Sequence, residues 1–237
     1  MGTTVDSALP SNIETIDQER LAWLALALTP GLGPRRILRA VRDVRSAEQI
    51  LPLPLTRLEA LQFPAEAVQF IADGKALEAA NKELEALQKS GAAFLTYSDP
   101  DYPERLREIF DAPPLLWIRG DATLLAKSAI AVVGTRHPTP YGSGMAEMLS
   151  RDLAARGLVI LSGMARGVDT SSHKGALAAK GKTVAVWAQA STSFIRKKTN
   201  PWPNRFLQAE ARSSPNFRWA LSLPRKTSPN VTASSAE

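Results

Sequence analysis

The spacing of hydrophobic residues divides the chain into a helical first part and a second part in which strands and helices alternate. Apolar residues recur at helical spacing from residue 16 to residue 28, and a second helix is predicted over 35–42. Between them lies the turn Thr-Pro-Gly-Leu-Gly-Pro at 29–34, whose glycines permit positive φ and a close backbone approach. Short helices punctuated by prolines continue to about residue 70, and an amphipathic helix follows over 75–89.

The second part has the alternating strands and helices that are typical of an α/β fold. Short strands are predicted over 93–97 and 115–118, and then a regular series begins: strand 130–133, helix 141–156, strand 158–161, helix 169–180 and strand 183–186. Continuous apolar strands separated by helices are typical of a parallel, doubly wound sheet with right-handed crossovers. We therefore expect an extended Rossmann-type parallel sheet, truncated at its C-terminal side and preceded by a small helical module of the helix-hairpin-helix or SAM-like kind.

Periodicity stops after Val186. The remaining residues mix Ser, Thr, Pro, Arg and Lys without a period of 2 or 3.6. The predicted organisation is a loose leader at 1–14, a helical module at 15–72, a partial Rossmann-type domain at 75–186 and a disordered tail at 187–237. A sheet that ended at the third parallel strand would leave that strand with an open edge.

A net charge of +6 is consistent with binding to nucleic acid, but the excess of basic residues is confined to the last part of the chain. Residues 187–237 carry eight basic and two acidic side chains, so they account for the whole surplus. Residues 1–186 are balanced, with 21 of each sign. Global basicity is therefore no evidence for DNA binding.

The remaining composition excludes several classes of protein. There is no cysteine, which removes disulfides and thiolate metal sites and suits a cytoplasmic location. No stretch is apolar enough for a membrane span, and the N-terminus lacks the pattern of a signal peptide. Two histidines are too few for a zinc site, so we expect neither a metal nor a cofactor.

Two loops at the carboxyl ends of predicted strands are candidates for binding phosphate, because ligands of open α/β sheets bind there. Guanidinium groups recognise phosphate with two hydrogen bonds, and small residues let an anion approach the backbone. The candidate residues are Gly134, Thr135, Arg136, Tyr141 and Gly142 in the first loop, and Ser162, Gly163, Arg166 and Gly167 in the second, with Lys174 as a weaker candidate.

Each of these features also has a plain structural interpretation. The glycine loops are neither a Walker loop nor a dinucleotide fingerprint, so they fit an ordinary strand-to-helix turn equally well. Arg166 suits a solvated surface, Asp169 suits the N-cap of a helix, and His173 suits a structural hydrogen bond. No nucleophile, acid–base pair or metal-ligand set is legible, and we therefore expect a protein that is not an enzyme.

The hairpin at 30–34 also has two interpretations. It resembles a helix-hairpin-helix, which grips DNA phosphates through backbone amides without reading sequence. It equally suits a tight turn that packs two helices together.

Several motifs, taken in order, resemble one family. They are Asp-Pro-Asp-Tyr-Pro-Glu-Arg-Leu at 99–106, Arg-Gly-Asp at 119–121, Val-Val-Gly-Thr-Arg at 132–136, Ser-Gly-Met-Ala-Arg-Gly-Val-Asp at 162–169, His173 with Gly-Ala-Leu at 175–177, and Gly-Lys-Thr-Val-Ala-Val at 181–186. Over roughly residues 15–186 this combination is similar to the DprA/Smf family of DNA-processing proteins.

The resemblance implies single-stranded DNA as the ligand, held in a basic pocket of the Rossmann-type domain. It also implies a homodimer that protects incoming DNA and loads RecA during natural transformation in competent cells. Arg136 would be the phosphate-binding arginine of the pocket, and Gly134, Ser162, Gly163 and Gly167 would shape the loops around it.

The resemblance breaks after about residue 186, where the family's later segments are missing. In an alternative reading frame, each codon begins at the third base of a present codon. In that frame, the nucleotides that encode residues 192–196, 212–219 and 227–237 can encode three of those segments in order. We therefore expect a frameshift or a sequencing error between about residues 186 and 191. The chain as written should bind DNA poorly, because half of the pocket is absent.

Two rival interpretations stay open. One is an enzyme, a nucleotide phosphoribohydrolase of the lysine-decarboxylase-like Rossmann group, although that group's Pro-Gly-Gly-x-Gly-Thr loop is absent from the sequence. The other is a gene remnant with no function.

Overall fold

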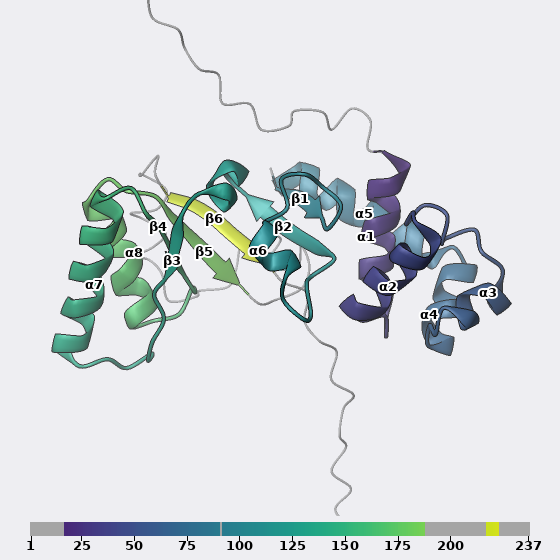
Figure 1. Cartoon of the computed structure of the whole chain (residues 1–237), viewed down its shortest axis with the longest axis horizontal. Helices are drawn as coiled ribbons and strands as arrows, with labels where there is room; N and C mark the ends of the chain where they lie inside the picture. Colours follow the sequence, from purple (N-terminus) through teal and green to yellow (C-terminus); the bar gives the residue numbers. More distant parts are fainter. Residues whose placement is uncertain (1–16, 91, 188–216, 223–237) are drawn as a thin grey trace, which may run out of the picture.

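The computed structural model describes residues 17–90, 92–187 and 217–222. It places a group of helices beside a six-stranded sheet, with two long helices packed at the far end of the sheet (Figure 1). The predicted leader at 1–14 lies outside the described residues, as does most of the predicted tail.

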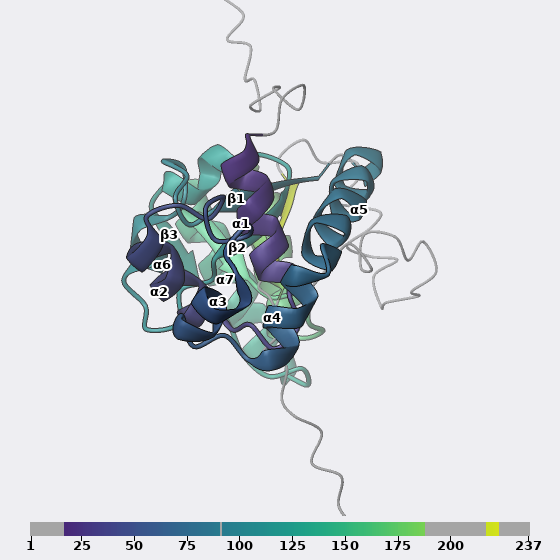
Figure 2. The same cartoon turned by 90° about the vertical axis from the view of Figure 1, so that its right-hand side faces the viewer.

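Five helices form the helical module. They are α1 (Gln18–Leu28), α2 (Pro34–Val44), α3 (Leu55–Ala60), α4 (Ala65–Ala72) and α5 (Lys75–Ser90). Trp23, Leu24, Ile37 and Leu58 are fully buried among them, so the apolar periodicity of the sequence does mark the core of this module. Figure 2, which looks onto the module, shows α1 and α5 lying side by side.

The sequence placed α5 with the second domain, whereas the structure packs it into the first. Ala76, Ala80 and Leu87 of α5 belong to the same buried cluster as α1. The cluster extends to Phe94 and Trp117 of the first two strands, so the helical module and the sheet share one continuous core. A boundary near residue 73 is therefore not a boundary between separate cores.

An arginine of α1 fastens the helical module to the sheet. The Arg20 guanidinium donates a 2.6 Å hydrogen bond to the carbonyl of Phe94 and lies 3.4 Å from the Asp99 carboxylate. That carboxylate also accepts a 2.8 Å hydrogen bond from the Thr96 amide. The Asp-Pro-Asp-Tyr-Pro motif, which begins at Asp99, is thus a structural joint between the two parts.

The sheet is mixed, with the strand order β1-β2-β6-β5-β4-β3. Its strands are β1 (Ala93–Thr96), β2 (Leu115–Arg119), β3 (Ala129–Ala131), β4 (Val159–Ser162), β5 (Thr183–Trp187) and β6 (Phe217–Ser222). Strands β3 to β6 pair in parallel, while β2 pairs antiparallel with both β1 and β6. This confirms the expected class, a Rossmann-type parallel sheet behind a helical module.

Strand β6 corrects the expectation that the whole tail from 187 to 237 lacks structure. It pairs with β5 in parallel, Thr183 opposite Phe217, and so covers the edge that was predicted to be open. The sequence Phe-Arg-Trp-Ala-Leu-Ser does alternate large apolar and other residues, a period of 2 that is too short to stand out within an irregular tail. Within the described residues, the open edge of the parallel strands is β3, where Ile130 is 40% exposed.

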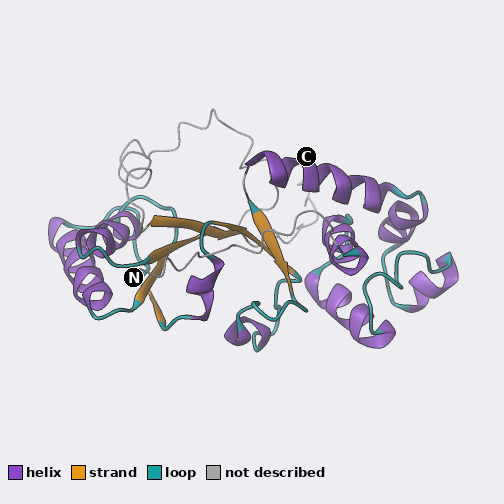
Figure 3. Cartoon of the chain, turned by 90° about the horizontal axis from the view of Figure 1, so that it is seen from above, coloured by secondary structure: helices purple, strands orange, loops and turns teal. Residues whose placement is uncertain are grey.

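Two crossover helices connect the parallel strands. Helix α7 (Pro140–Ala155) links β3 to β4, and α8 (Val168–Ala178) links β4 to β5. The two helices pack against each other at one end of the molecule, as Figure 3 shows from above. Successive strands advance in one direction, so β3 to β5 form one half of the doubly wound arrangement that the sequence predicted.

The buried face of α7 differs from the one that its leucines suggest. Ala146, Ser150 and Ala154 are buried, whereas Leu149 is exposed. The reason is the close approach of α8, where a Cβ on Gly175 would lie only 2.0 Å from the Glu147 carbonyl oxygen. Such a short separation requires small residues at the contact, and it turns the larger side chains outward.

Shorter elements complete the fold. Helix α6 (Glu104–Arg107) follows the Asp-Pro-Asp-Tyr-Pro motif, and the 3-10 helix η1 (Ala122–Ala126) precedes β3. No helix among the described residues is both long and apolar enough to cross a membrane.

Candidate nucleic-acid interface

The two glycine loops lie at the carboxyl ends of neighbouring strands and touch each other. The amide of Val168 donates a 3.2 Å hydrogen bond to the carbonyl of Thr135, which joins the loop after β4 to the loop after β3. At the strand ends, Val132 donates to the Leu161 carbonyl at 2.9 Å, and the Ser162 hydroxyl donates to the Val132 carbonyl at 2.7 Å. The structure therefore brings the two predicted loops together on one edge of the sheet.

Three of the predicted glycines are required by this close approach. A Cβ on Gly167, whose φ is +86°, would lie 2.4 Å from the Thr135 carbonyl oxygen. A Cβ on Gly134 would lie 2.7 Å from a methyl of Val168, and one on Gly163 would lie 2.5 Å from the Asp169 carboxylate. Each separation is shorter than a non-bonded contact allows, so a side chain on Gly134 or Gly167 would force the two loops apart, and one on Gly163 would displace Asp169 within the second loop.

Two helix N-termini open at the same edge. Thr139 caps α7 by accepting a 3.1 Å hydrogen bond from the Gly142 amide, and Pro140 begins that helix. Gly167 is the N-cap of α8 and makes no side-chain hydrogen bond. Pro140 has no N–H, and the Gly142 and Val168 amides are already engaged, so these helix ends favour a bound anion chiefly through the positive end of the helix dipole.

The arginines of the loops are exposed. Arg136 and Arg166 form no ion pair with a carboxylate within the described part of the chain. Tyr141, at the start of α7, is 77% exposed. Gly142 has no neighbour closer than 3.5 Å to an added Cβ, so space alone does not require a glycine there. Two cations and one aromatic ring are thus displayed around the joined loops.

The hydroxyl of Ser162, one of the candidate phosphate-binding residues, is already engaged within the sheet. The residue is buried, and its hydroxyl donates within the sheet to the Val132 carbonyl. It holds the ends of β3 and β4 together and does not present a donor to a ligand.

Asp169 is likewise not the N-cap of α8, because the helix begins at Val168 and Gly167 caps it. The buried carboxylate of Asp169 instead accepts a 3.1 Å hydrogen bond from the Ala165 amide and so fixes the loop from within. Lys174, one turn further along α8, is half-buried, and its role in binding stays a prediction.

His173 makes structural hydrogen bonds, as the sequence predicted. One ring nitrogen, Nε2, lies 2.9 Å from the Gly163 carbonyl oxygen, and Nδ1 lies 2.7 Å from the Thr183 hydroxyl. Burial lowers the pKa of His173, although the bond to Gly163 and the charge of Asp169 oppose that shift. The ring is therefore neutral at pH 7, with Nε2 donating to the carbonyl, and it ties the second loop to β5.

A known protein family matches this chain. A model of the family described as DNA recombination-mediator protein A matches residues 93–213, just over half of the chain. This chain belongs to the DprA/Smf family. The DNA processing protein DprA of Bacillus subtilis is 41% identical over 102 residues, which are 43% of this chain and 34% of that protein. Protein Smf of Synechocystis is 31% identical over 177 residues, which are 72% of this chain and 44% of that protein.

A solved member of the family shares the fold. The X-ray structure of DprA from Streptococcus pneumoniae superposes with a TM-score of 0.60 at 27% identity, covering 88% of this chain and 68% of that one. The chain thus spans less than half the length of the two curated DprA/Smf relatives named above.

Sequence reasoning missed one member of the candidate site. Thr139 was not singled out, although a threonine directly before a proline is a familiar signal for an N-cap followed by the first helical residue. In this DprA/Smf chain it fixes the start of α7 beside the loop that carries Arg136.

Proposed function

We propose that this chain binds the sugar-phosphate backbone of single-stranded DNA on the joined loops at 134–142 and 162–169. The observation that carries the proposal is the hydrogen bond between Val168 and Thr135, because it gathers two exposed arginine loops at one edge of the sheet. Arg136 and Arg166 would contact successive phosphates.

The backbone supports the same ligand. The positive ends of the α7 and α8 dipoles favour a phosphate at this edge of the sheet, and the glycines of the loops place no Cβ between that phosphate and the backbone. Tyr141 offers an exposed ring on which an unpaired base can stack. Contacts of this kind bind nucleic acid without reading its sequence.

The wider role that we propose is that of a recombination mediator in natural transformation. The protein would act in the cytoplasm as a homodimer, protect incoming single strands and deliver them to RecA. Membership of the DprA/Smf family supports this role. We further propose that it acts without catalysis, and the buried His173 and Asp169 support this because both are engaged in hydrogen bonds that hold the fold.

We also propose that the sequence loses its reading frame between about residues 186 and 191, and that DNA binding is weaker than in a full-length relative. The three family segments recoverable in one alternative frame support this. Resequencing these codons separates the two causes: a one-base difference restores the family's reading and shows a sequencing error, whereas an unchanged nucleotide sequence excludes such an error.

The binding proposal is tested by fluorescence anisotropy with a labelled oligothymidylate. We expect Arg136→Ala combined with Arg166→Ala to weaken binding and to reduce the slope of log affinity against log salt by about 1.4, because a single strand releases roughly 0.7 counterions per phosphate. Arg156→Ala, at the opposite end of α7, is the matched control and should change neither quantity. Equal binding by the double variant and the control would exclude the loops as the site. Release of free base from a nucleoside monophosphate would instead favour the phosphoribohydrolase.

A further inference from the structure

The hairpin between α1 and α2 ends in a helix N-terminus that opens into a groove. Gly31 adopts a φ of +71°, Gly33 is the N-cap of α2, and Pro34 is its first residue. No side chain among the described residues caps this end of the helix. Pro34 has no N–H, and the Arg36 and Ile37 amides donate to the Gly33 carbonyl, which leaves the Arg35 amide of the first turn available to a ligand.

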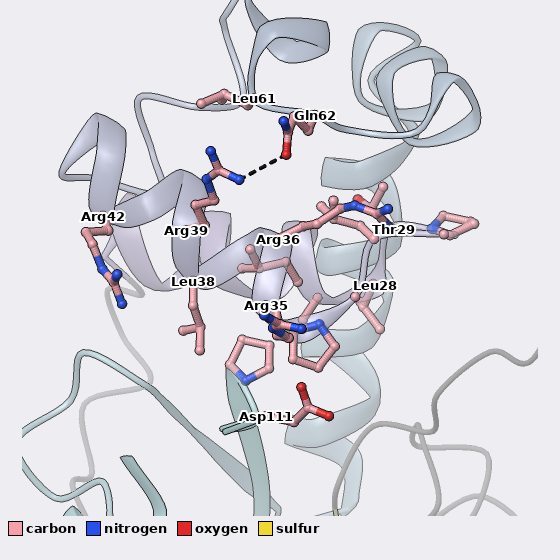
Figure 4. Close-up of a pocket in the computed structure, with 18 of the residues that line it drawn as sticks. Leu28, Thr29, Arg35, Arg36, Leu38, Arg39, Arg42, Leu61, Gln62 and Asp111 are labelled. Carbon is pink, nitrogen blue, oxygen red and sulfur yellow. Dashed lines mark hydrogen bonds between the residues drawn. The ribbon is translucent and has the colours of Figure 1, made fainter. Parts of the chain in front are cut away.

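The groove lies between the helical module and the segment that leads into β2. It encloses about 1110 Å³. Helix α2 forms one wall, Gln62 and Phe110 contribute to the others, and Pro114 and Trp117 come from the start of the sheet. Figure 4 shows four arginine side chains extending from α2 around this space, with Asp111 below Arg35.

The charge around the groove is strongly positive. Arg35, Arg36, Arg39 and Arg42 line it against a single carboxylate, that of Asp111. Arg39 is oriented by a 2.9 Å hydrogen bond to the Gln62 side chain. All four arginines are exposed, and Arg39 also lies 3.8 Å from the Asp43 carboxylate of its own helix.

The position of the first two arginines conflicts with the helix dipole. Arg35 and Arg36 occupy the first turn of α2, which contains no acidic residue. Cations at the positive end of a helix are destabilising, and a bound anion relieves that conflict. Such a local violation of helix-forming rules points to a binding role.

An exposed aromatic ring gives the groove its second property. Phe110 is 78% exposed, and the Arg35 guanidinium lies 4.1 Å from the centre of its ring. A large apolar side chain this exposed gains nothing from folding, whereas it offers an unpaired base a surface for stacking. Trp117, which lines the same groove, has a buried indole N–H for which the described part of the chain supplies no hydrogen-bond partner.

We propose that this groove is a second site for single-stranded nucleic acid, with the α2 arginines on phosphates and Phe110 stacked on a base. Arginines interleaved with an exposed aromatic ring suit an unpaired strand better than a duplex, whose bases are already stacked. An acidic peptide could pair with the arginines, but its carboxylates would not stack on the Phe110 ring. The site lies between the helical module and the segment that leads into β2, and it does not include the loops at β3 and β4.

The test is anisotropy of the 237-residue chain with labelled oligothymidylate and with an abasic oligonucleotide of the same length. Replacing Arg35, Arg36 and Arg42 together by alanine should reduce the salt slope by about 2, at roughly 0.7 per phosphate contact. Phe110→Ala should weaken binding of oligothymidylate roughly tenfold and leave the abasic strand unaffected, since only a base can stack. Arg57→Ala, on the exposed face of α3 outside the groove, is the matched control.

Unchanged affinity and salt slope in the triple arginine variant would overturn the proposal, as would an equal loss for both oligonucleotides in Phe110→Ala. Arginine-dependent binding of a polyglutamate peptide, without any effect on DNA, would also overturn it and assign the groove to an acidic protein. The loop variants separate the two sites: if Arg136 and Arg166 account for all binding, the groove fails while the proposed function stands. If the groove variants abolish all binding and the loop variants change nothing, the loops are excluded as a site and the groove is supported.

Discussion

The amide of Val168 donates a 3.2 Å hydrogen bond to the carbonyl of Thr135, and this contact makes two separate strand-to-helix turns into one surface. It is possible only because Gly167 has no side chain, since a Cβ there would meet the same carbonyl oxygen at 2.4 Å. The binding surface therefore depends on backbone geometry as much as on the arginines that it displays.

Gly167→Ala should destabilise the fold and abolish the loop contact. We expect a loss of about 3 kcal/mol in the free energy of unfolding, from backbone strain at φ +86° and from the clash with Thr135. Gly157→Ala is the matched control, because Gly157 has the same φ of +86° but no neighbour within 4 Å, and it should lose only about 1 kcal/mol. Urea denaturation measures both, and equal losses would mean that the contact with Thr135 contributes nothing.

Gly175→Ala should separate α7 from α8. The new methyl would lie 2.0 Å from the Glu147 carbonyl oxygen, so we expect a loss of about 2–3 kcal/mol from overpacking. Gly144→Ala, also within a helix but with open space around it, should instead gain about 0.5–1 kcal/mol from helix propensity. Thermal unfolding followed by circular dichroism distinguishes the two signs. A stabilised Gly175→Ala protein would contradict the close packing.

Arg20→Ala should loosen the attachment of the helical module to the sheet. The variant loses the bonds to the Phe94 carbonyl and the Asp99 carboxylate, and we expect a cost of about 1–2 kcal/mol. Arg20→Lys should recover only part of this, because one ammonium group cannot reproduce the geometry of the guanidinium. Arg57→Ala serves as the exposed control, and a loss no larger than that of the control would show that the joint is not needed for stability.

Acid should destabilise the protein through His173. Burial lowers the pKa of His173 in the folded state below its unfolded value of 6.5, so the unfolded chain binds the proton more readily. The associated stability is fully present above pH 6.5 and is lost as pH falls below it, with a slope of at most about 1.4 kcal/mol per pH unit. Unfolding free energies between pH 5 and 7 should therefore decline with acid.

His173→Gln should remove that slope, because the glutamine amide can donate to the Gly163 carbonyl in place of Nε2 without titrating. The carboxylate of Glu19 does not interfere in this range. Although partial burial raises its pKa, hydrogen bonds from Glu48, Ser46 and Ala47 outweigh that effect and hold it below the ordinary value of 4.5. A slope that persists in the glutamine variant would assign the acid sensitivity to another group.

Much of the local structure followed from the sequence. The predicted strand over 183–186 is observed as Thr183–Trp187, and the predicted helix over 75–89 is observed as Lys75–Ser90. Periodicity succeeds at such segments because burial of one face repeats with the period of the element. It failed on α7, where the close approach of α8 selects Ala146, Ser150 and Ala154 for burial and leaves Leu149 outside. No pattern within α7 itself reveals that neighbour.

The candidate site also combines features that the sequence determines with features that only the tertiary structure decides. The sequence determined which residue types stand at the ends of β3 and β4, because glycine, serine and arginine follow directly after the apolar runs that predict these strands. Only the tertiary structure decided that Ser162 is already occupied by the Val132 carbonyl, and that β6 lies between β2 and β5. It also decided that α2 and Phe110, far apart in sequence, face one groove. These outcomes depend on pairings between distant segments, whose free energy comes from contacts that no local stretch of sequence contains.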